Sequence, residues 1–209
     1  MLLHGLFKSA QNLNRRRRMR RSWEHQWRKP NFCPNWLADA PRPFVITGFE
    51  RGWLAPRMTV LEIGCGRGRT AAWLAERGLQ VVALDISPYV IEQARKRFCN
   101  QPDLEFRCAD VCVPANLSTV FDVILDTGCL QHLHPSLRGG YCENLLVWSR
   151  PGSRFVVTMH KVTHSASERR LGVQALLSTH FDLVYTEEVP PANAEKFRHL
   201  NSVFHFVRR

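Results

Sequence analysis

The sequence of 209 residues predicts an α/β protein with a mostly parallel sheet and helices on both faces. From residue 58 onward, short runs rich in valine, isoleucine and leucine alternate with segments of helical periodicity. This alternation is typical of parallel strands joined by crossover helices. A glycine-rich turn directly follows the first apolar run and opens the first helix, which is where such sheets bind nucleoside-containing ligands.

The expected strands and helices follow in a regular order. We expect strands at residues 59–63, 80–85, 104–109, 121–125, 154–160, 181–186 and 202–207, and helices at 70–77, 88–98 and 137–148. Ser87 as N-cap, followed by Pro88, predicts where the second helix begins. The last two strands have no clear helix between them, so we expect them to close the sheet as an antiparallel pair.

The composition is that of a globular domain, with 44% hydrophobic and 22% charged residues. Seven cysteines without C-x-x-C or paired zinc spacing predict reduced thiols and no metal site. No apolar run approaches the roughly 20 residues of a membrane helix, so we expect no membrane span. A cytoplasmic monomer is expected. The mitochondrial matrix is the alternative for a eukaryotic source, because the chain begins with an arginine-rich, acid-poor segment.

The net charge of +11 is concentrated at the N-terminus, where the first 23 residues contain seven basic and no acidic side chains. We expect residues 1–21 to form a mobile basic arm outside the folded body, because no aromatic side chain alternates with the arginines as a base-stacking surface requires. Binding of RNA phosphates or anionic lipid through this arm stays open.

A proline-rich segment follows, with four prolines between residues 30 and 43, and predicts irregular chain. It separates the N-terminal residues from the alternating body. We therefore divide the chain into the arm at 1–21, an aromatic-rich segment at 22–57 and a core at 58–209.

The glycine turn has the pattern G-x-G-x-G, with an acid two residues ahead of it. Glycines let the backbone approach a ligand closely, and the free N–H groups of the following helix favour its polar end. Nicotinamide and flavin sites favour G-x-G-x-x-G, whereas the third glycine here comes one residue earlier. The ligand better suited to this turn is S-adenosylmethionine, which presents an amino-acid end instead of a pyrophosphate. The candidate residues are Glu62, Gly64, Cys65, Gly66 and Gly68.

Two further carboxylates follow the second and third strands. Asp85 stands where a ribose diol would lie at the switch point of the sheet, followed by Ile86. Asp110, followed by Val111, could accept a hydrogen bond from an exocyclic adenine amine. The ends of three consecutive strands thus offer suitable partners for three parts of one ligand: its polar end, its ribose and its adenine.

These residues resemble the class I S-adenosylmethionine-dependent methyltransferases over residues 58–160. The resemblance implies a Rossmann-like, seven-stranded sheet of order 3-2-1-4-5-7-6 with an antiparallel seventh strand. It also implies S-adenosylmethionine as cofactor and S-adenosylhomocysteine as product. Asp126 and Thr127, after the fourth strand, would hold the methionine end.

A narrower resemblance rests on the tryptophans ahead of the core. Trp23 and Trp27 form W-x-x-x-W, followed by P-N-W at 34–36 and G-W-L-A-P at 52–56. This is similar to the thiopurine, tellurite-resistance and halide/thiol methyltransferase group, in which such a segment folds over the cofactor. Trp23 and Trp27 would then line the pocket, as part of a lid at residues 22–57. The polar, glycine-containing link usual in that group is replaced here by residues 30–33.

Four side chains are candidates at the substrate side: Cys129, His132, His134 and His160. A histidine general base is one interpretation, with His132 or His160 as the catalytic candidate. A metal site and simple hydrogen-bonded histidines are the alternatives, and the two-residue spacing of His132 and His134 disfavours metal.

The function predicted from these observations is methyl transfer from S-adenosylmethionine to a small-molecule acceptor: a thiol, chalcogen anion or halide. The fourth strand lacks the Asn/Asp-Pro-Pro-aromatic element of enzymes that methylate base amines. An RNA methyltransferase that docks through the arm, or a non-catalytic cofactor-binding module, are the alternatives.

Overall fold

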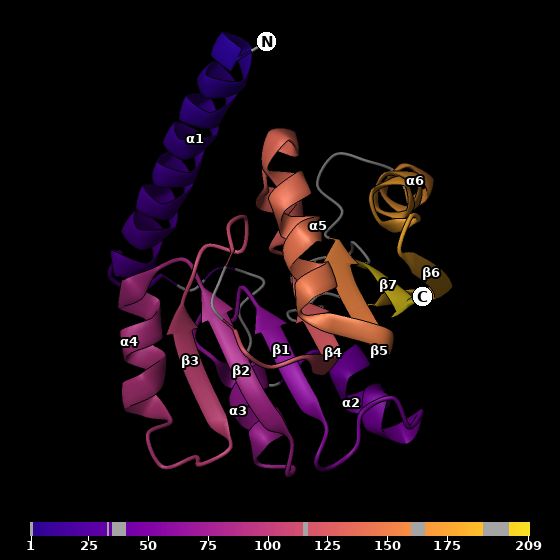
Figure 1. Cartoon of the computed structure of the whole chain (residues 1–209). Helices are drawn as coiled ribbons and strands as arrows, with labels where there is room; N and C mark the ends of the chain where they lie inside the picture. The colour runs from indigo at the N-terminus through magenta and orange to yellow at the C-terminus, as the bar shows by residue number, and fades with distance from the viewer. Residues whose placement is uncertain (1, 33, 35–40, 115–116, 160–165, 190–200) are drawn as a thin grey trace.

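The computed structural model describes residues 2–32, 34, 41–114, 117–159, 166–189 and 201–209. Its centre is a seven-stranded sheet of order β3-β2-β1-β4-β5-β7-β6 (Figure 1). The strands are β1 (Thr59–Ile63), β2 (Gln80–Asp85), β3 (Leu104–Cys108), β4 (Phe121–Asp126), β5 (Ser149–Met159), β6 (Phe181–Val189) and β7 (Asn201–Arg208). The first five pair in parallel, and β7 runs antiparallel to both of its neighbours. The fold class, the strand order and the closing antiparallel pair are confirmed.

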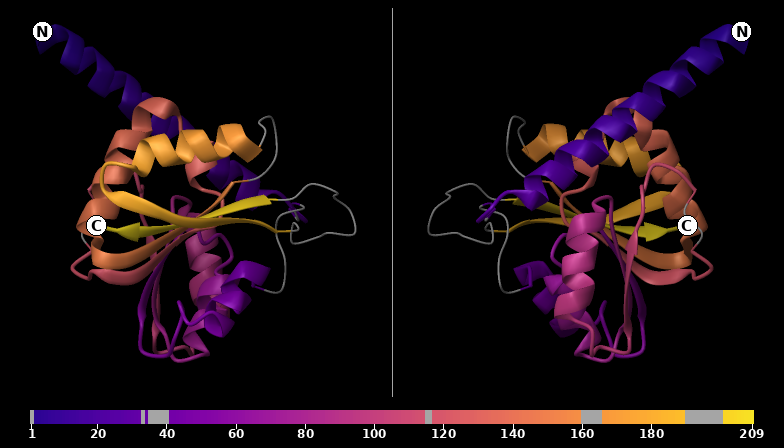
Figure 2. Two further views of the ribbon diagram at one scale, coloured as in Figure 1. Left: turned by 90° about the vertical axis from the view of Figure 1, so that its right-hand side faces the viewer. Right: turned by 90° about the vertical axis from the view of Figure 1, so that its left-hand side faces the viewer.

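Helices cover both faces of the sheet (Figure 2). One layer contains α2 (Pro43–Glu50), α3 (Arg69–Ala75) and α4 (Pro88–Arg97); the other contains α5 (Arg138–Val147) and α6 (Ala166–Leu177). Two short 3-10 turns, η1 (Leu130–His132) and η2 (Pro135–Leu137), connect β4 to α5. Helix α4 begins as expected, because the Ser87 hydroxyl accepts a hydrogen bond from Val90 N at 3.3 Å.

Each face of the sheet buries its own apolar cluster. Tyr141 of α5 and Trp148, the C-cap of α5, are fully buried on one face, and Phe44 of α2 and Leu74 of α3 on the other. Because both faces are covered, the central parallel strands are buried almost throughout. This rigid block fixes the carboxyl ends of β1, β2, β3 and β4 along one edge.

The N-terminal region forms a helix where the sequence analysis expects a mobile basic arm and an aromatic-rich segment. One helix, α1 (Leu2–Arg28), runs through the predicted arm and on into the tryptophan segment, so the boundary at residue 21 falls inside an element. Long unbranched side chains such as arginine favour helix, and no proline occurs before Pro30. The N-terminal end of α1 projects away from the body in both views of Figure 2.

Two other helices were not expected from the sequence. Helix α2 begins at Pro43, the last of the four prolines, and α6 precedes β6. Among the described helices, none is long and apolar enough to cross a membrane.

Candidate functional site

The glycine turn after β1 needs glycine for its backbone and for its packing. Gly64, Gly66 and Gly68 have φ angles of +70°, +52° and +72°, which side chains disfavour. A Cβ on Gly64 would lie 3.1 Å from the Cβ of Cys129, and one on Gly66 would lie 3.0 Å from the ring of Trp27. The turn is therefore pressed between the β4 loop and α1.

Asp85 closes the turn from the neighbouring strand. Its Oδ2 accepts from Gly66 N at 3.0 Å and its Oδ1 from Ser87 N at 2.9 Å. The residue is 8% exposed, and burial raises the pKa of its carboxyl to about 6. A carboxylate has about four acceptor positions, so Asp85 keeps capacity for hydroxyl donors such as a ribose diol.

Four members of the glycine motif do not line the pocket: Glu62, Cys65, Gly66 and Gly68. Glu62 is 2% exposed, and burial raises the pKa of its carboxyl to about 8. A hydrogen bond from Ala71 N and the positive charge of Arg42 act in the opposite direction and lower this pKa. Burial also raises the pKa of the Cys65 thiol. Gly68 forms the N-cap of α3. These residues shape the turn, and their predicted contact with a cofactor stays a prediction.

Asp126 organises the loop after β4. Its carboxylate is fully buried and accepts from Gly128 N at 2.9 Å, Cys129 N at 2.6 Å, Leu130 N at 2.9 Å and the Tyr141 hydroxyl at 2.6 Å. Asp126 does not line the main pocket, and its predicted contact with a methionine end stays a prediction. Asp126 instead fixes the backbone that begins η1.

Asp110, after β3, is engaged by α1. Its Oδ2 accepts from Arg16 Nε at 2.7 Å and its Oδ1 from Cys112 N at 3.0 Å. Its carboxylate faces a second cavity rather than the main pocket, whereas the neighbouring Val111 lines the main pocket. The predicted adenine contact of Asp110 would therefore compete with Arg16.

Helix α1 is fastened across the carboxyl edge of the sheet at two further places. Glu24 Oε2 accepts from the Ser87 hydroxyl at 2.5 Å and from Tyr89 N at 3.2 Å, where it caps the start of α4. Ser136 of η2 donates from its hydroxyl to Asn12 Oδ1 at 2.7 Å. The helix thus passes over the site from α4 to η2 as a cover.

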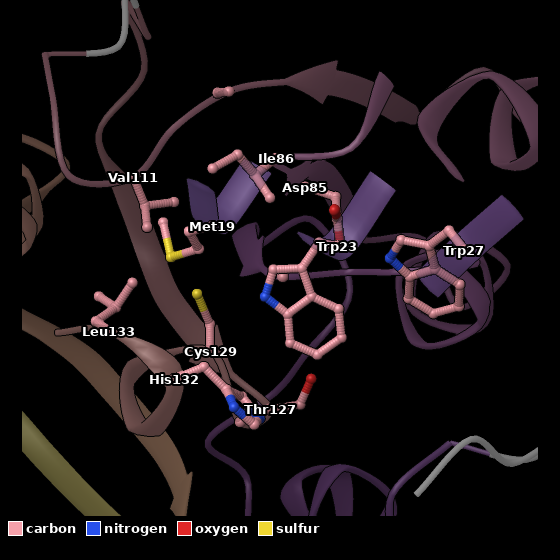
Figure 3. A pocket seen from close by; sticks show the side chains of 13 residues that line it. Met19, Trp23, Trp27, Asp85, Ile86, Val111, Thr127, Cys129, His132 and Leu133 are labelled. Atoms are coloured by element: carbon pink, nitrogen blue, oxygen red, sulfur yellow. The ribbon is translucent and has the colours of Figure 1, made fainter. Parts of the chain in front are cut away.

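The main pocket lies between α1 and the ends of β1, β2 and β4 (Figure 3). Nine of the candidate residues from the sequence line it: Trp23, Trp27, Gly64, Asp85, Ile86, Val111, Thr127, Cys129 and His132. The other lining residues are Met19, Ala109, Gly128 and Leu133. Met19 is absent from the sequence-based prediction because it lies inside the arginine run, where only helix formation turns it toward the pocket.

Trp23 occupies the middle of this pocket in Figure 3, with its ring edge-on to His132 at a centroid distance of 5.2 Å. The cavity that remains is about 90 Å³, whereas ligand pockets are commonly about 300–1,000 Å³. A nucleoside-sized ligand therefore requires Trp23 or α1 to move.

The histidine candidates have different surroundings. His132 lines the pocket, and burial lowers the pKa of its imidazole, which favours the neutral form that can accept a proton. His134 instead caps η2, where its Nδ1 accepts from Ser136 N at 3.2 Å. His160 lies outside the described residues. Cys129 also lines the pocket, and burial raises the pKa of its thiol.

Metal binding gains no support from the described residues, which contain no group of three or more His, Cys, Asp or Glu side chains suited to an ion. The expectation of a metal-free site stays a prediction. A nucleoside ligand fits the site better than a metal ion does. The glycine turn has space for its backbone but not for larger side chains, and Asp85 beside it can accept further hydrogen bonds.

Comparison with known proteins agrees with this topology. Residues 60–152 match a family model described as a methyltransferase domain. Over this part, somewhat under half of its length, the chain is similar to methyltransferase domains. The domain match includes the glycine turn, Asp85, Asp110 and the β4 loop, and leaves out α1.

The curated proteins to which the chain is similar include the following two methyltransferases. It is 29% identical over 126 residues to a 2-heptyl-1-hydroxyquinolin-4(1H)-one methyltransferase of Mycobacteroides abscessus, with 59% of this chain and 55% of that protein covered. It is 29% identical over 142 residues to a ubiquinone biosynthesis O-methyltransferase of Methylocella silvestris, with 65% and 55% covered. The chain thus spans about half the length of these relatives.

Solved structures share the fold at lower identity. A TehB-like SAM-dependent methyltransferase from Corynebacterium glutamicum superposes with a TM-score of 0.64 at 20% identity, covering 91% of this chain and 98% of that one. The glycopeptide N-methyltransferase MtfA complexed with S-adenosylmethionine gives a TM-score of 0.65 at 17% identity, covering 85% and 91%. At these low sequence identities, the similarity shows a shared fold only.

Proposed function

We propose that the protein transfers a methyl group from S-adenosylmethionine to a small-molecule acceptor. The observation that carries this proposal is the order of groups along the carboxyl edge of the sheet. Val111 and Ala109 after β3 would flank the adenine, Asp85 after β2 would hold the ribose, and the Gly64 turn after β1 would receive the methionine part. The loop after β4 then lies at the reactive end.

The residues of the β4 loop would position the acceptor. Thr127, Cys129 and His132 line the pocket there, opposite Trp23 of α1. When bound, S-adenosylmethionine supplies an electrophilic methyl group on a sulfonium centre. The protein must then hold the acceptor in line with that methyl group and exclude water, and the tryptophans of α1 suit this covering role.

The acceptor class that we propose is a thiol, chalcogen anion or halide. Such a nucleophile arrives already anionic, and it gains reactivity when an apolar pocket removes its water. The lining is mainly apolar, and Asp85 is the one carboxylate among the lining residues that the structure describes. The narrower resemblance to thiopurine, tellurite-resistance and halide/thiol methyltransferases supports the same class.

A hydroxyl acceptor is the second candidate, favoured by the position of His132. A neutral imidazole that lines the pocket can take the proton that an alcohol or phenol loses during transfer. One curated relative is named for a hydroxyquinolinone acceptor and the other for O-methylation in ubiquinone biosynthesis. In both cases we expect a cytoplasmic monomer.

Transfer of labelled methyl from S-adenosylmethionine to a panel of acceptors tests the proposal. The panel contains a low-pKa aromatic thiol, iodide, selenite, small phenols and total RNA. We expect transfer to a small acceptor, and His132→Ala to retain transfer to the thiol within about tenfold while lowering transfer to a phenol by roughly 10²-fold or more. Transfer to RNA alone, or binding without any transfer, would contradict the proposal and favour the RNA-methylating or non-catalytic alternative.

A further inference from the structure

A second cavity lies beside the main pocket, between α1 and the carboxyl end of β3. It is open to solvent and has a volume of about 270 Å³, several times the roughly 30 Å³ that one water molecule takes in the liquid. Ile86 and Ala109 line both cavities, so they form the wall between them. A ligand in the second cavity would lie next to the adenine end of the proposed cofactor site.

Arginine side chains dominate this second cavity. Arg16, Arg17 and Arg20 all line it, together with the carboxylate of Asp110. These three positions lie on one side of α1, since residues three or four apart on a helix are neighbours. The cavity therefore has a cationic wall that belongs to α1 and a mostly apolar wall that belongs to the sheet.

The positive charge of this wall is only partly balanced. Arg16 pairs with Asp110 at 2.7 Å. Within the part of the chain that the structure describes, no side chain forms an ion pair or hydrogen bond with Arg17 or Arg20. Two positive charges of the cavity are thus left for a ligand.

The chemistry of the wall favours phosphate. A guanidinium presents a planar fork of donors that matches phosphate oxygens two at a time. A phosphate monoester carries about −1.5 to −2 charges at pH 7, and two successive phosphodiesters of an RNA strand carry one charge each. Either matches the two arginines without partners better than one carboxylate would. The methyl donor has no phosphate, so the anion must come from another molecule.

We propose that this second cavity binds a phosphate group of a ligand other than the methyl donor. The phosphate comes either from a small sugar phosphate or from the backbone of an RNA chain. The proposal concerns binding at α1 and does not depend on methyl transfer, so it stands or fails separately from the proposed activity.

The test uses the full chain and two phosphate sources. Ribose 5-phosphate is titrated by calorimetry with ribose as the phosphate-free control, and a labelled single-stranded RNA of about 12 nucleotides is titrated by fluorescence anisotropy. Ribose 5-phosphate contains no adenine, so it does not compete for the cofactor pocket through a base. The critical variant combines Arg17→Gln with Arg20→Gln.

A matched control separates a defined site from diffuse attraction. Arg18→Gln combined with Arg21→Gln removes the same charge from the same helix, at positions that do not line the cavity. We expect affinity for at least one probe to fall about tenfold or more in the Arg17/Arg20 variant and less than about threefold in the control, at equal melting temperature.

Each result has a defined meaning. Selective loss for ribose 5-phosphate identifies a small-molecule source, and selective loss for RNA alone identifies a polymer source. Equal loss in both variants would show general attraction to a basic helix and overturn the site. Absence of binding of either probe to the parent protein at low salt would overturn it as well.

Discussion

The pocket has two halves that are held in different ways. The half that belongs to the sheet depends on fully buried groups: Asp126 is 0% exposed and accepts four hydrogen bonds. The half that belongs to α1 is held by Arg16 and Asp110, whose side chains are 27% and 18% exposed, and by Glu24, at 21%. We call the half formed by the strand ends the framework half and the half formed by α1 the covering half. The two halves differ in how deeply their polar contacts are buried.

This difference indicates which half moves. Partly exposed ion pairs stabilise a contact by about 0–1 kcal/mol, whereas a buried, fully bonded carboxylate fixes its loop strongly. Regions held by few and exposed contacts open at low free-energy cost. We infer that α1 opens to admit ligands while the strand ends keep their geometry.

Replacement of Asp126 should have the largest effect, because it breaks the framework half. Asp126→Ala leaves three backbone N–H groups and the Tyr141 hydroxyl without their acceptor, at about 1–3 kcal/mol each when buried. We expect the free energy of unfolding to fall by at least about 3 kcal/mol in urea denaturation. A loss below 1 kcal/mol would show that water replaces the carboxylate and that the loop is not rigid. Tyr141→Phe, which removes one of the four bonds, is the graded control.

Replacement of Asp85 tests the framework half as a ligand site. Asp85→Ala removes the proposed acceptor of the ribose hydroxyls, and we expect S-adenosylmethionine to bind about 2–3 kcal/mol more weakly by calorimetry. Asp122→Ala is the control, because Asp122 lies at the opposite end of β4 and does not line the pocket. Unchanged affinity in a folded Asp85→Ala protein would remove this residue from the cofactor site.

The pH dependence of stability extends the comparison to the far strands of the sheet. His205 is fully buried in β7, its Nε2 lies 2.8 Å from Glu187 Oε1, and burial lowers the pKa of its imidazole from 6.5 to about 4. The unfolded chain then binds the proton more tightly, so stability is full above about pH 6.5 and is lost as the pH falls toward 4.

His205→Gln should remove this part of the acid sensitivity. We expect the parent protein to lose up to about 1.4 kcal/mol of unfolding free energy per pH unit more than the variant between pH 6 and 4.5. His180→Gln, at an exposed histidine, serves as the control and should keep the parental slope. If the unfolding free energies of the parent and of His205→Gln fell equally with pH, His205 would be protonated in the folded protein.

Replacement of Glu24 should have the smallest effect on stability, because it breaks only the covering half. Glu24→Gln weakens the contacts to the Ser87 hydroxyl and Tyr89 N while keeping the side-chain shape. We expect less than about 1 kcal/mol of change in global stability, but faster hydrogen exchange within α1 than within α3. A uniform increase of exchange over both helices would contradict independent opening of α1.

Much of the framework half could be predicted from the sequence. The residues at β1 and β2, the N-cap at Ser87 and the pairing of the last two strands follow from local patterns with periods of two or 3.6 residues. The glycine spacing likewise placed Gly64 and Asp85 at the pocket, because consecutive parallel strands end at one edge. Contacts along one strand or turn depend on neighbours in the sequence, so a single sequence contains them.

The covering half could not be predicted in the same way. Arg16 with Asp110 and Glu24 with Ser87 join residues 94 and 63 positions apart, and no local pattern encodes such pairs. The sequence by itself determined the class I fold, the glycine turn and the acidic strand ends. Only the tertiary structure decided that the basic segment is a helix across the site, that Asp126 accepts hydrogen bonds from its own loop, and that Met19 lines the pocket. The physical reason is that these outcomes depend on which surfaces meet after the sheet has formed, and not on the propensities of the segments themselves.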